Sequence, residues 1–321
     1  MYQDTVQEAK LLSKPPFVVA LFVCFFIIFY AIDFSQTILA DILRPAIGES
    51  TDSTIYARFV TGFTLSAVVT LSIWLIGKLA VKAQSITVWL IMAALFILFF
   101  TSFNLSFAFI QSKIWFMISQ GILTTLYISV ISITLASILA IIGAVAKLSS
   151  NGFANGLASF YTSFFRGLPL LMQVYLIYLG LPQVGFVIDA VPAGILALSL
   201  CYGAYMTEIF RAGIESIPKG QWEAARSIGF KFGLTMRKVI LPQAVPLIIP
   251  PTGNQFIAML KDSSLVSVIG VWELMFLART LGQKDFKHME MLVTAAMLYW
   301  MMSMVLEFAQ SHIERRYRKG Q

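Results

Sequence analysis

The chain has 321 residues, of which 58% are hydrophobic and 12% are charged. Because charged residues make up about a quarter of a typical globular protein, this composition excludes an ordinary soluble domain. The net charge of +7 comes from lysines and arginines scattered over short polar segments between apolar runs. That pattern indicates membrane topology and not a nucleic-acid-binding surface.

Charge-poor segments predict eight membrane-crossing helices. A crossing helix needs about 20 apolar residues, and helices are the default because lipid offers no partners for open backbone groups. The spans are expected over about residues 16–38, 58–78, 84–106, 117–146, 153–181, 191–211, 240–260 and 289–310. Alternating segments of about ten residues, which mark a transmembrane β-barrel, do not occur. The predicted fold class is an all-α polytopic membrane protein.

The distribution of lysine and arginine predicts the orientation of these spans. Threading the chain from a cytoplasmic N-terminus leaves most of the 23 basic residues on the cytoplasmic side, as the positive-inside tendency requires. Both termini are then cytoplasmic, and the loop over about residues 39–57 faces outward. The first apolar run lacks a small-residue cleavage site, so we expect no removable signal peptide.

One segment between two apolar spans, Glu215–Leu241, is unusually polar and predicts two short cytoplasmic helices. Pro218 suits the first position of a helix, where its missing N–H has no partner anyway. Gly229 falls where a left-handed residue would end that helix. A second helix over Phe230–Ile240 is expected to end before Pro242, which cannot donate the next backbone bond.

The first of these helices has a small apolar edge with charges at its rim. Helical spacing places Trp222, Ala225 and Gly229 along this edge, beside Glu223 and Arg226. Such an edge suits insertion into a groove on another protein. A helix lying on lipid headgroups, with Trp222 as an interfacial anchor, explains the same pattern. The periodicity leaves both interpretations open.

Longer motifs carry a family resemblance. They are "RGLPLLMQVYLIYLGLP" (166–182), "GAYMTEIFRAGIESIPKGQWEAARSIG" (203–229) and "LPQAVPLIIPPTGNQFIAMLKDSSLVSVIG" (241–270). Over about residues 113–316 the chain resembles ABC-importer permeases of the polar amino-acid uptake family, of the histidine, glutamine and glutamate permease type. Val239 stands where the family usually has Ile before Leu-Pro, and Gly-Leu-Pro at 167–169 replaces the commoner Gly-Thr-Pro.

The resemblance implies a five-helix permease core of the type I ABC-importer kind in residues 113–321, with three extra helices in residues 1–112. It also implies a second permease subunit, either the same chain or a paralogue, and a solute-binding protein at the outer face. A cytoplasmic ABC ATPase dimer would bind ATP and Mg²⁺, so no cofactor is expected in this chain. The expected ATPase-coupling residues are Trp222, Glu223, Ala224, Ala225 and Gly229.

A first candidate for solute contact lies in the sixth predicted span. Tyr202, Tyr205 and Glu208 share one helical face, and polar groups inside a span are costly and tend to be functional. The carboxylate would take a substrate ammonium. Alternatively, Glu208 pairs with Arg211 at the cytoplasmic end of the span.

A second candidate lies in the next span, whose prolines predict an interrupted helix, which is tolerable only against protein or a water-filled cavity. Polar residues follow these prolines: Asn254, Gln255, Lys261, Asp262, Ser263 and Ser264. Lys261 would meet a substrate carboxylate, with the hydroxyls and amides completing the site. Alternatively, a Lys261–Asp262 pair caps the helix at the outer membrane face. Arg166 also lies near a membrane edge and is a candidate partner for an intramembrane ion pair.

These patterns predict the membrane subunit of an ATP-driven importer for a polar amino acid. Another small polar solute, such as an opine or a quaternary amine, is the nearer alternative, and an intramembrane enzyme is the more distant one. The sequence has no phosphate-binding G-x-x-x-x-G-K-[ST] motif. Its two histidines lie at opposite ends of the last span, so neither ATP binding nor a metal site is expected in this chain.

Overall fold

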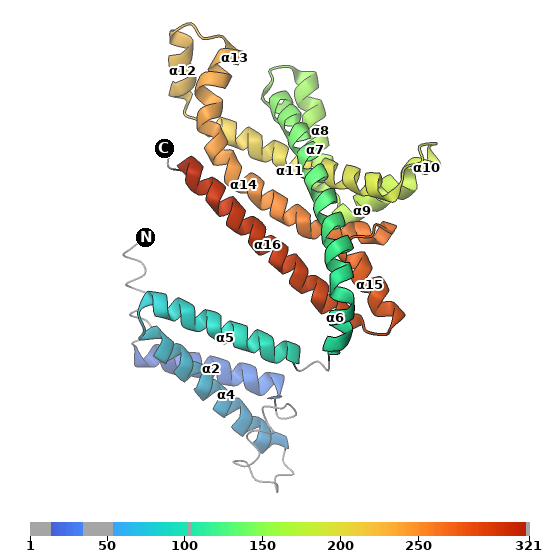
Figure 1. Cartoon of the computed structure of the whole chain (residues 1–321). Helices are drawn as coiled ribbons and strands as arrows, with labels where there is room; N and C mark the ends of the chain where they lie inside the picture. The colour runs from blue at the N-terminus through green and yellow to red at the C-terminus, as the bar shows by residue number, and fades with distance from the viewer. Residues whose placement is uncertain (1–13, 35–53, 102–104, 319–321) are drawn as a thin grey trace. The chain divides into compact units, whose positions relative to one another are not determined.

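The computed structural model describes residues 14–34, 54–101 and 105–318, which are almost entirely helical and contain no strand (Figure 1). They form two compact units, one ending at Asn104 and one beginning at Leu105. The predicted boundary after residue 112 falls inside α6 (Phe107–Phe116). Seven helical segments among the described residues are long and apolar enough to cross a membrane, or eight if one bent pair is a single span. The all-α polytopic prediction is therefore confirmed.

The first unit contains α2 (Pro15–Ile32), α4 (Thr54–Gly77) and α5 (Val81–Thr101). Aromatic rings join α2 to α4: Phe26 meets Phe59 edge to face, with ring centroids 5.2 Å apart. Arg58 of α4 donates hydrogen bonds to the last carbonyls of α2, at Tyr30 and Ala31, where a cation is favourable. Most of the predicted outward loop over residues 39–57 lies outside the described residues.

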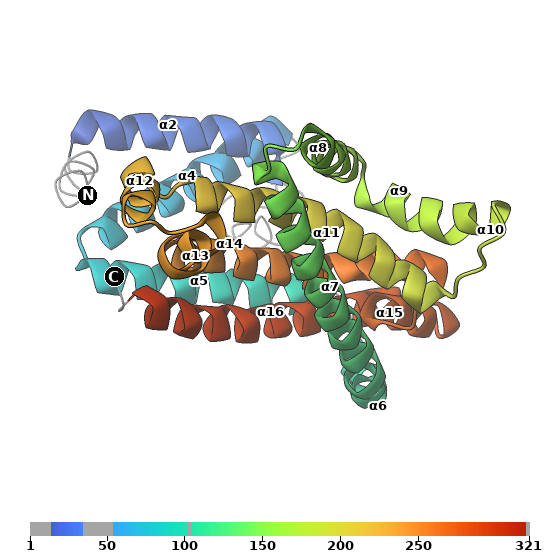
Figure 2. The ribbon, with the colours of Figure 1, turned by 90° about the horizontal axis from the view of Figure 1, so that it is seen from above.

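The second unit contains the remaining helices. They are α6, η2 (Met117–Ile122), α7 (Leu123–Leu148), α8 (Gly152–Gly167), α9 (Leu170–Tyr175), η3 (Leu176–Gly180), α10 (Leu181–Gln183), α11 (Ala190–Glu215), α12 (Lys219–Ser227), α13 (Phe232–Thr235), η4 (Met236–Ile240), α14 (Leu241–Asp262), η5 (Ser263–Ile269), α15 (Leu274–Lys284) and α16 (His288–Arg318). In Figures 1 and 2, α12 and α13 lie at one end of this unit, near the C-terminal end of α16.

Helix α11 is the centre of the second unit and packs against α7, α8 and α14. Small residues allow the close approach that holds helices together in lipid. A methyl group on Gly143 of α7 would lie 2.4 Å from the hydroxyl oxygen of Thr207. A methyl group on Gly203 of α11 would lie 2.6 Å from the hydroxyl of Tyr161. The two glycines therefore set the distance at which α7 and α8 contact α11.

The fifth predicted span, over residues 153–181, is not one straight helix. Helix α8 and the segment Leu170–Gln183, which begins with α9, meet at an angle of 107°. The residue before Pro169 is disfavoured in the helical conformation, and Leu168 is extended. The buried side chain of Gln173 donates to the carbonyls of Phe165 and Leu168. We call residues 167–169, held in this way, the α8–α9 break.

The prediction of an interrupted penultimate span is wrong in its details. Helix α14 runs without interruption through Pro246, Pro250 and Pro251. Pro242 also fails to end the preceding helix, since the π-helical turn η4 leads directly into it. Irregular backbone instead occurs at the two ends of α14, as the π-helical turn before it and the 3-10 turn η5 after it.

Candidate functional site: a polar pocket and a short polar helix

The α8–α9 break forms one wall of a pocket of about 410 Å³, which we call the polar pocket. Helices α11 and the C-terminal half of α14 supply the other walls. The lining residues are Arg166, Gly167, Leu168, Pro169, Leu170, Cys201, Tyr202, Tyr205, Gln255 and Asp262. Three elements that are distant in the sequence therefore contribute polar side chains to one cavity.

The polar pocket contains one group of each charge. The Arg166 guanidinium lies over the ring of Tyr205, 5.4 Å from its centroid, and 43% of its side chain is exposed. The carboxylate of Asp262 accepts a hydrogen bond of 2.7 Å from the hydroxyl of Tyr202. A planar guanidinium matches a carboxylate, and an ionised acid accepts from an ammonium. The arrangement is therefore suited to a zwitterion.

Four of the predicted solute residues meet in this pocket: Tyr202, Tyr205, Gln255 and Asp262. The other four on α14 and η5 do not line it. Asn254 and Lys261 are exposed, and Asn254 accepts from Gln310 instead. The hydroxyl of Ser263 is buried against the carbonyl of Leu260. Ser264 is half-buried outside the pocket. Asp262 bonds to Tyr202, and no Lys261–Asp262 ion pair is found among the described residues.

Glu208 belongs to an ion cluster and not to the pocket wall. Its carboxylate pairs with Lys147, with Arg211 at 2.9 Å and with Arg166 at 3.8 Å, and Arg211 also pairs with Glu215. The alternative pairing of Glu208 with Arg211 is thus the one observed. Because three cations already surround this carboxylate, the structure argues against Glu208 as a free site for a substrate ammonium.

Arg166 was predicted as an intramembrane pair partner, but its place in the pocket was not foreseen. The signal available in the sequence was Gly-Leu-Pro at 167–169. A proline preceded by an extended residue ends a helix, so the side chain at the end of α8 lies beside the opening that the turn creates. A single straight span over residues 153–181 does not predict this position of Arg166.

The short polar helix predicted after Pro218 is observed as α12, and its end has the expected geometry. Gly229 has φ of +81°, a region that favours glycine. The N–H of Phe230 bonds to the carbonyl of Ala225, and the N–H of Gly229 bonds to that of Arg226. This is the Schellman pattern, which satisfies the last carbonyls of the helix. The prediction of a left-handed stop at Gly229 is confirmed.

The predicted docking edge faces this chain itself. Ala225 is 3% exposed, and Trp222 stacks on Phe232 with ring centroids 6.2 Å apart. Trp222 also packs against a buried cluster that includes Ile214 and Ile217 of the α11 end. Trp222 therefore packs α12 against the end of α11. Glu223 and Ala224 of α12 and Gly229 just beyond its end are exposed, so these three predicted docking residues are open to a partner.

Comparisons with known proteins decide the family. Residues 139–319 match the family described as "Binding-protein-dependent transport system inner membrane component". The chain belongs to this permease family. The resemblance noted from the sequence motifs is confirmed, and the protein is a multi-pass inner-membrane protein.

Relatives of the permease are similar along most of their length. The arginine transport system permease protein ArtQ of Bacillus subtilis is 39% identical over 68% of this chain and 99% of its own. The L-cystine transport system permease protein TcyB of the same organism is 39% identical over 64% of this chain and 89% of its own. A crystal structure of an amino acid ABC transporter with histidines is 37% identical, with a TM-score of 0.63 over 67% of this chain and 100% of that one.

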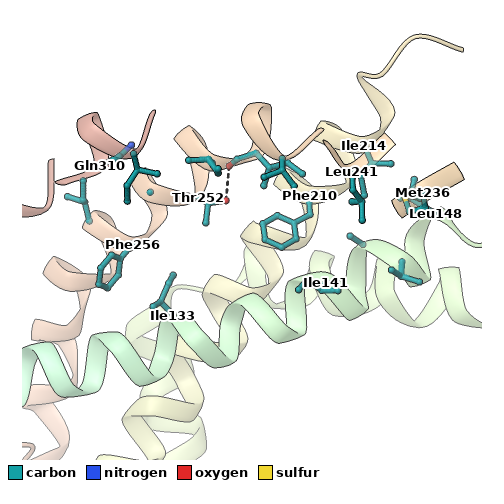
Figure 3. Close-up of a pocket in the computed structure, with 18 of the residues that line it drawn as sticks. Ile133, Ile141, Leu148, Phe210, Ile214, Met236, Leu241, Thr252, Phe256 and Gln310 are labelled. Atoms are coloured by element: carbon teal, nitrogen blue, oxygen red, sulfur yellow. Dashed lines mark hydrogen bonds between the residues drawn. The ribbon is translucent and has the colours of Figure 1, made fainter. Parts of the chain in front are cut away.

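The permease also has a larger apolar groove of about 870 Å³, between α7, α11, α14 and α16 (Figure 3). Its wall is formed by side chains such as Ile133, Phe210 and Phe256. Thr252 on the same wall donates to the carbonyl of Ile248. A surface of this kind suits acyl chains or an apolar helix. A charged solute would lose its hydration there without compensation, so size does not make this groove the solute site.

Proposed function

We propose that this permease passes an α-amino acid through the polar pocket as part of an ATP-driven importer. The observation that carries the proposal is the presence of Arg166 and Asp262 in one cavity between α8, α11 and α14. Arg166 binds the α-carboxylate as a charge-assisted pair. Asp262 binds the α-ammonium, and its hydrogen bond from Tyr202 keeps the carboxylate in place.

The pocket composition favours a solute whose side chain carries no net charge. The zwitterionic head uses the guanidinium of Arg166 and the carboxylate of Asp262, and the remaining polar lining is Gln255, Tyr202 and Tyr205. An amide and two phenols bond to an amide or hydroxyl side chain without leaving a buried charge unpaired. A quaternary amine, the alternative solute, would leave Arg166 without an anion.

The remaining machinery comes from partner subunits. We propose that α12 is the coupling helix: it docks on a cytoplasmic ABC ATPase dimer that binds ATP and Mg²⁺. A second permease subunit completes the pathway, and a solute-binding protein delivers the amino acid at the outer face. The matched family, a component of binding-protein-dependent transport systems, supports this assembly. The grouping of α12 and the C-terminal end of α16 at one end of the unit (Figure 1) is compatible with both lying in the cytoplasm.

Binding measurements on the purified importer test the solute site. Arg166→Gln and Asp262→Asn should each weaken binding of radiolabelled L-glutamine, L-arginine or L-cystine, whichever the unaltered importer binds. The loss should be on the order of tenfold or more, because a hydrogen bond to a charged group contributes about 1.5–3 kcal/mol. Arg279→Gln changes an exposed arginine outside the pocket and serves as the control. Full binding by both pocket variants would rule out this site.

Co-purification tests the docking of α12. Glu223→Lys reverses an exposed charge on the face open to a partner, and should reduce both recovery of the ATPase and solute uptake. Gly229→Val forces a β-branched residue into a left-handed conformation, which costs about 1–2 kcal/mol or more. Gly220→Ala on the same helix meets nothing within 4 Å and is the matched control. ATPase recovery that is equal in all three variants would contradict the docking proposal.

A further inference from the structure

We propose that Glu208 is a positioning residue that transmits occupancy of the polar pocket to the coupling helix α12. The inference rests on the proposed function, because it takes the pocket as the solute site and α12 as the ATPase contact. Its basis is a series of ion pairs from Arg166 to the end of α11, followed by the packing of that end against α12.

The first part of this series is the Glu208 ion cluster, made of Lys147, Arg166, Glu208, Arg211 and Glu215. Arg166 lines the polar pocket and also lies 3.8 Å from the Glu208 carboxylate. The other oxygen of Glu208 accepts from Arg211 at 2.9 Å. Arg211 in turn lies 2.5 Å from Glu215. The cluster therefore runs along α11 from the pocket to the last residue of the helix.

The charges of the cluster allow Arg166 to change partners. Three cations face two carboxylates, so the cluster carries one surplus positive charge beside the pocket. Arg166 has the longest of the three pairs with Glu208, and its side chain is 43% exposed, against 16% for Lys147. A solute carboxylate thus competes with Glu208 for Arg166. Glu208 remains compensated by Lys147 and Arg211 when Arg166 leaves, so the exchange leaves no buried charge unpaired.

The second part of the series joins the α11 end to α12. Ile214 and Ile217, on either side of Glu215, pack in one buried cluster with Trp222 of α12. Gln243 of α14 also donates to Gln221 of α12 at 3.3 Å. A shift of the last turn of α11 therefore moves α12 with it. A packed element of this kind is a physical route for coupling.

Two variants interrupt the series without removing a residue of the pocket wall. Glu208→Gln removes the shared carboxylate. Arg211→Gln removes the link to Glu215 and leaves Glu208 paired with Lys147 and Arg166, so it leaves no surplus of buried charge to disturb folding. Glu307→Gln, an exposed acid on α16, is the control.

The experiment uses the permease with its partner ATPase in lipid nanodiscs. The probe is whichever of L-glutamine, L-arginine and L-cystine binds the unaltered complex most tightly. Two quantities are measured: the dissociation constant of this amino acid, and the ratio of ATP hydrolysis rates with and without it. Arg211→Gln should bind the amino acid within about threefold of the unaltered complex, and Glu208→Gln should bind it at least as tightly, because the competitor for Arg166 is gone. In both variants the effect of solute on hydrolysis should fall by at least about fivefold, the low end of ordinary coupling factors.

Three results would overturn the inference. One is an unchanged effect of solute on hydrolysis in both variants. Another is a loss of solute binding in Arg211→Gln as large as its loss of the solute effect on ATP hydrolysis. The cluster would then only stabilise the pocket. The third is hydrolysis in the unaltered complex that does not respond to bound solute. If Arg166→Gln and Asp262→Asn bind the amino acid as tightly as the unaltered complex, the proposed solute site fails instead, which separates the two failures.

Discussion

Gln255 and Asp262 line the same pocket from one face of α14, two helical turns apart. Their difference in charge sets the selectivity expected for the solute side chain. Gln255→Glu adds a second carboxylate, so it should favour L-arginine over L-glutamine relative to the unaltered protein. The expected change in the affinity ratio is about tenfold, or 1.4 kcal/mol. Competition binding measures it.

Asn254→Asp is the matched control for this substitution. It adds the same charge one residue earlier, at a side chain that is exposed and outside the pocket lining. A change in selectivity of equal size in both variants would mean that the added charge acts on the solute through long-range electrostatics and not through direct contact in the pocket.

A second residue-scale prediction concerns Glu273, between the last two membrane-spanning segments. Its carboxylate is fully buried, accepts from the N–H groups of Met275 and Phe276 at the start of α15, and accepts from the hydroxyl of Tyr299. Burial raises the pKa of Glu273 from 4.5 to about 7, although these hydrogen bonds oppose the shift. The folded protein therefore holds a proton that the unfolded chain has already released.

The consequence is a pH-dependent stability with a defined sign. Because the folded-state pKa is raised, this contribution is complete below about pH 4.5 and is lost as the pH rises to about 7. The expected loss is at most about 1.4 kcal/mol per pH unit within that window. Glu273→Gln cannot titrate, so its thermal unfolding midpoint in detergent should fall less than that of the unaltered protein between pH 5 and 7. Parallel curves for the two proteins would contradict the prediction.

At the scale of elements, the α8–α9 break depends on Gln173. Its amide bonds to two carbonyls that the bend leaves without helical partners, and its side chain is 2% exposed. Gln173→Leu should cost about 1–3 kcal/mol, because both half-buried carbonyls lose a donor. Solute affinity should fall as well, since Arg166 sits at the end of α8. Thermal unfolding and solute binding measure the two effects.

Gln183→Leu provides the comparison on the same bent segment. Gln183 is exposed and donates to one carbonyl, that of Leu179. Exposed carbonyls bond to water when a side-chain donor is removed, so little change is expected. Equal losses in the two variants would mean that Gln173 has no special role at the bend.

Elements with a strong local signal could be predicted from the sequence. Long charge-poor runs gave the spans because the bilayer thickness fixes the length of a crossing helix. The stop at Gly229 followed from the conformational freedom of glycine. The continuity of α14 through its prolines could not be predicted, because it depends on packing against other helices. The bend at Pro169 had a local signal in Gly-Leu-Pro at 167–169, but the donor that stabilises it, Gln173, lies beyond the bend.

The candidate site was predicted only in part for the same reason. Tyr202, Tyr205, Gln255 and Asp262 were selected because polar groups are costly inside a span. Which of them share a cavity depends on how α11 and α14 are rotated. Charge pairing also depends on distant partners: Lys147, which pairs with Glu208, lies on another helix and at a separation of 61 residues.

At the scale of the whole molecule, the second unit contains its own buried clusters. One surrounds α11 and another joins α6, η2, α15 and α16, with members such as Ala197 and Met291. A variant that begins at Leu105 keeps these clusters, and keeps the hydrogen bond from Ser106 to Glu290. We expect it to fold in detergent and to bind solute within about threefold of the full chain. The reason is that changes at distant sites without shared partners usually have independent effects.

A matched truncation that begins at Leu123 shows what loss of stability follows when a core cluster is disrupted. It removes α6 and η2, and with them Met117, which is fully buried in the cluster with Leu274 and Met291. This shorter variant should aggregate or unfold. If the variant that begins at Leu105 fails equally, the first unit has a role in the stability of the permease core.

The 107° bend between α8 and α9 has a bearing on how new cargo specificities arise. The bent main chain creates the volume of this cavity, so the cavity does not require short side chains along its walls. Under the proposed function, exchanges at a position such as Gln255 change which solute binds, while the cavity itself remains. Permeases of one fold can in this way come to bind different solutes through single substitutions, without a change of backbone.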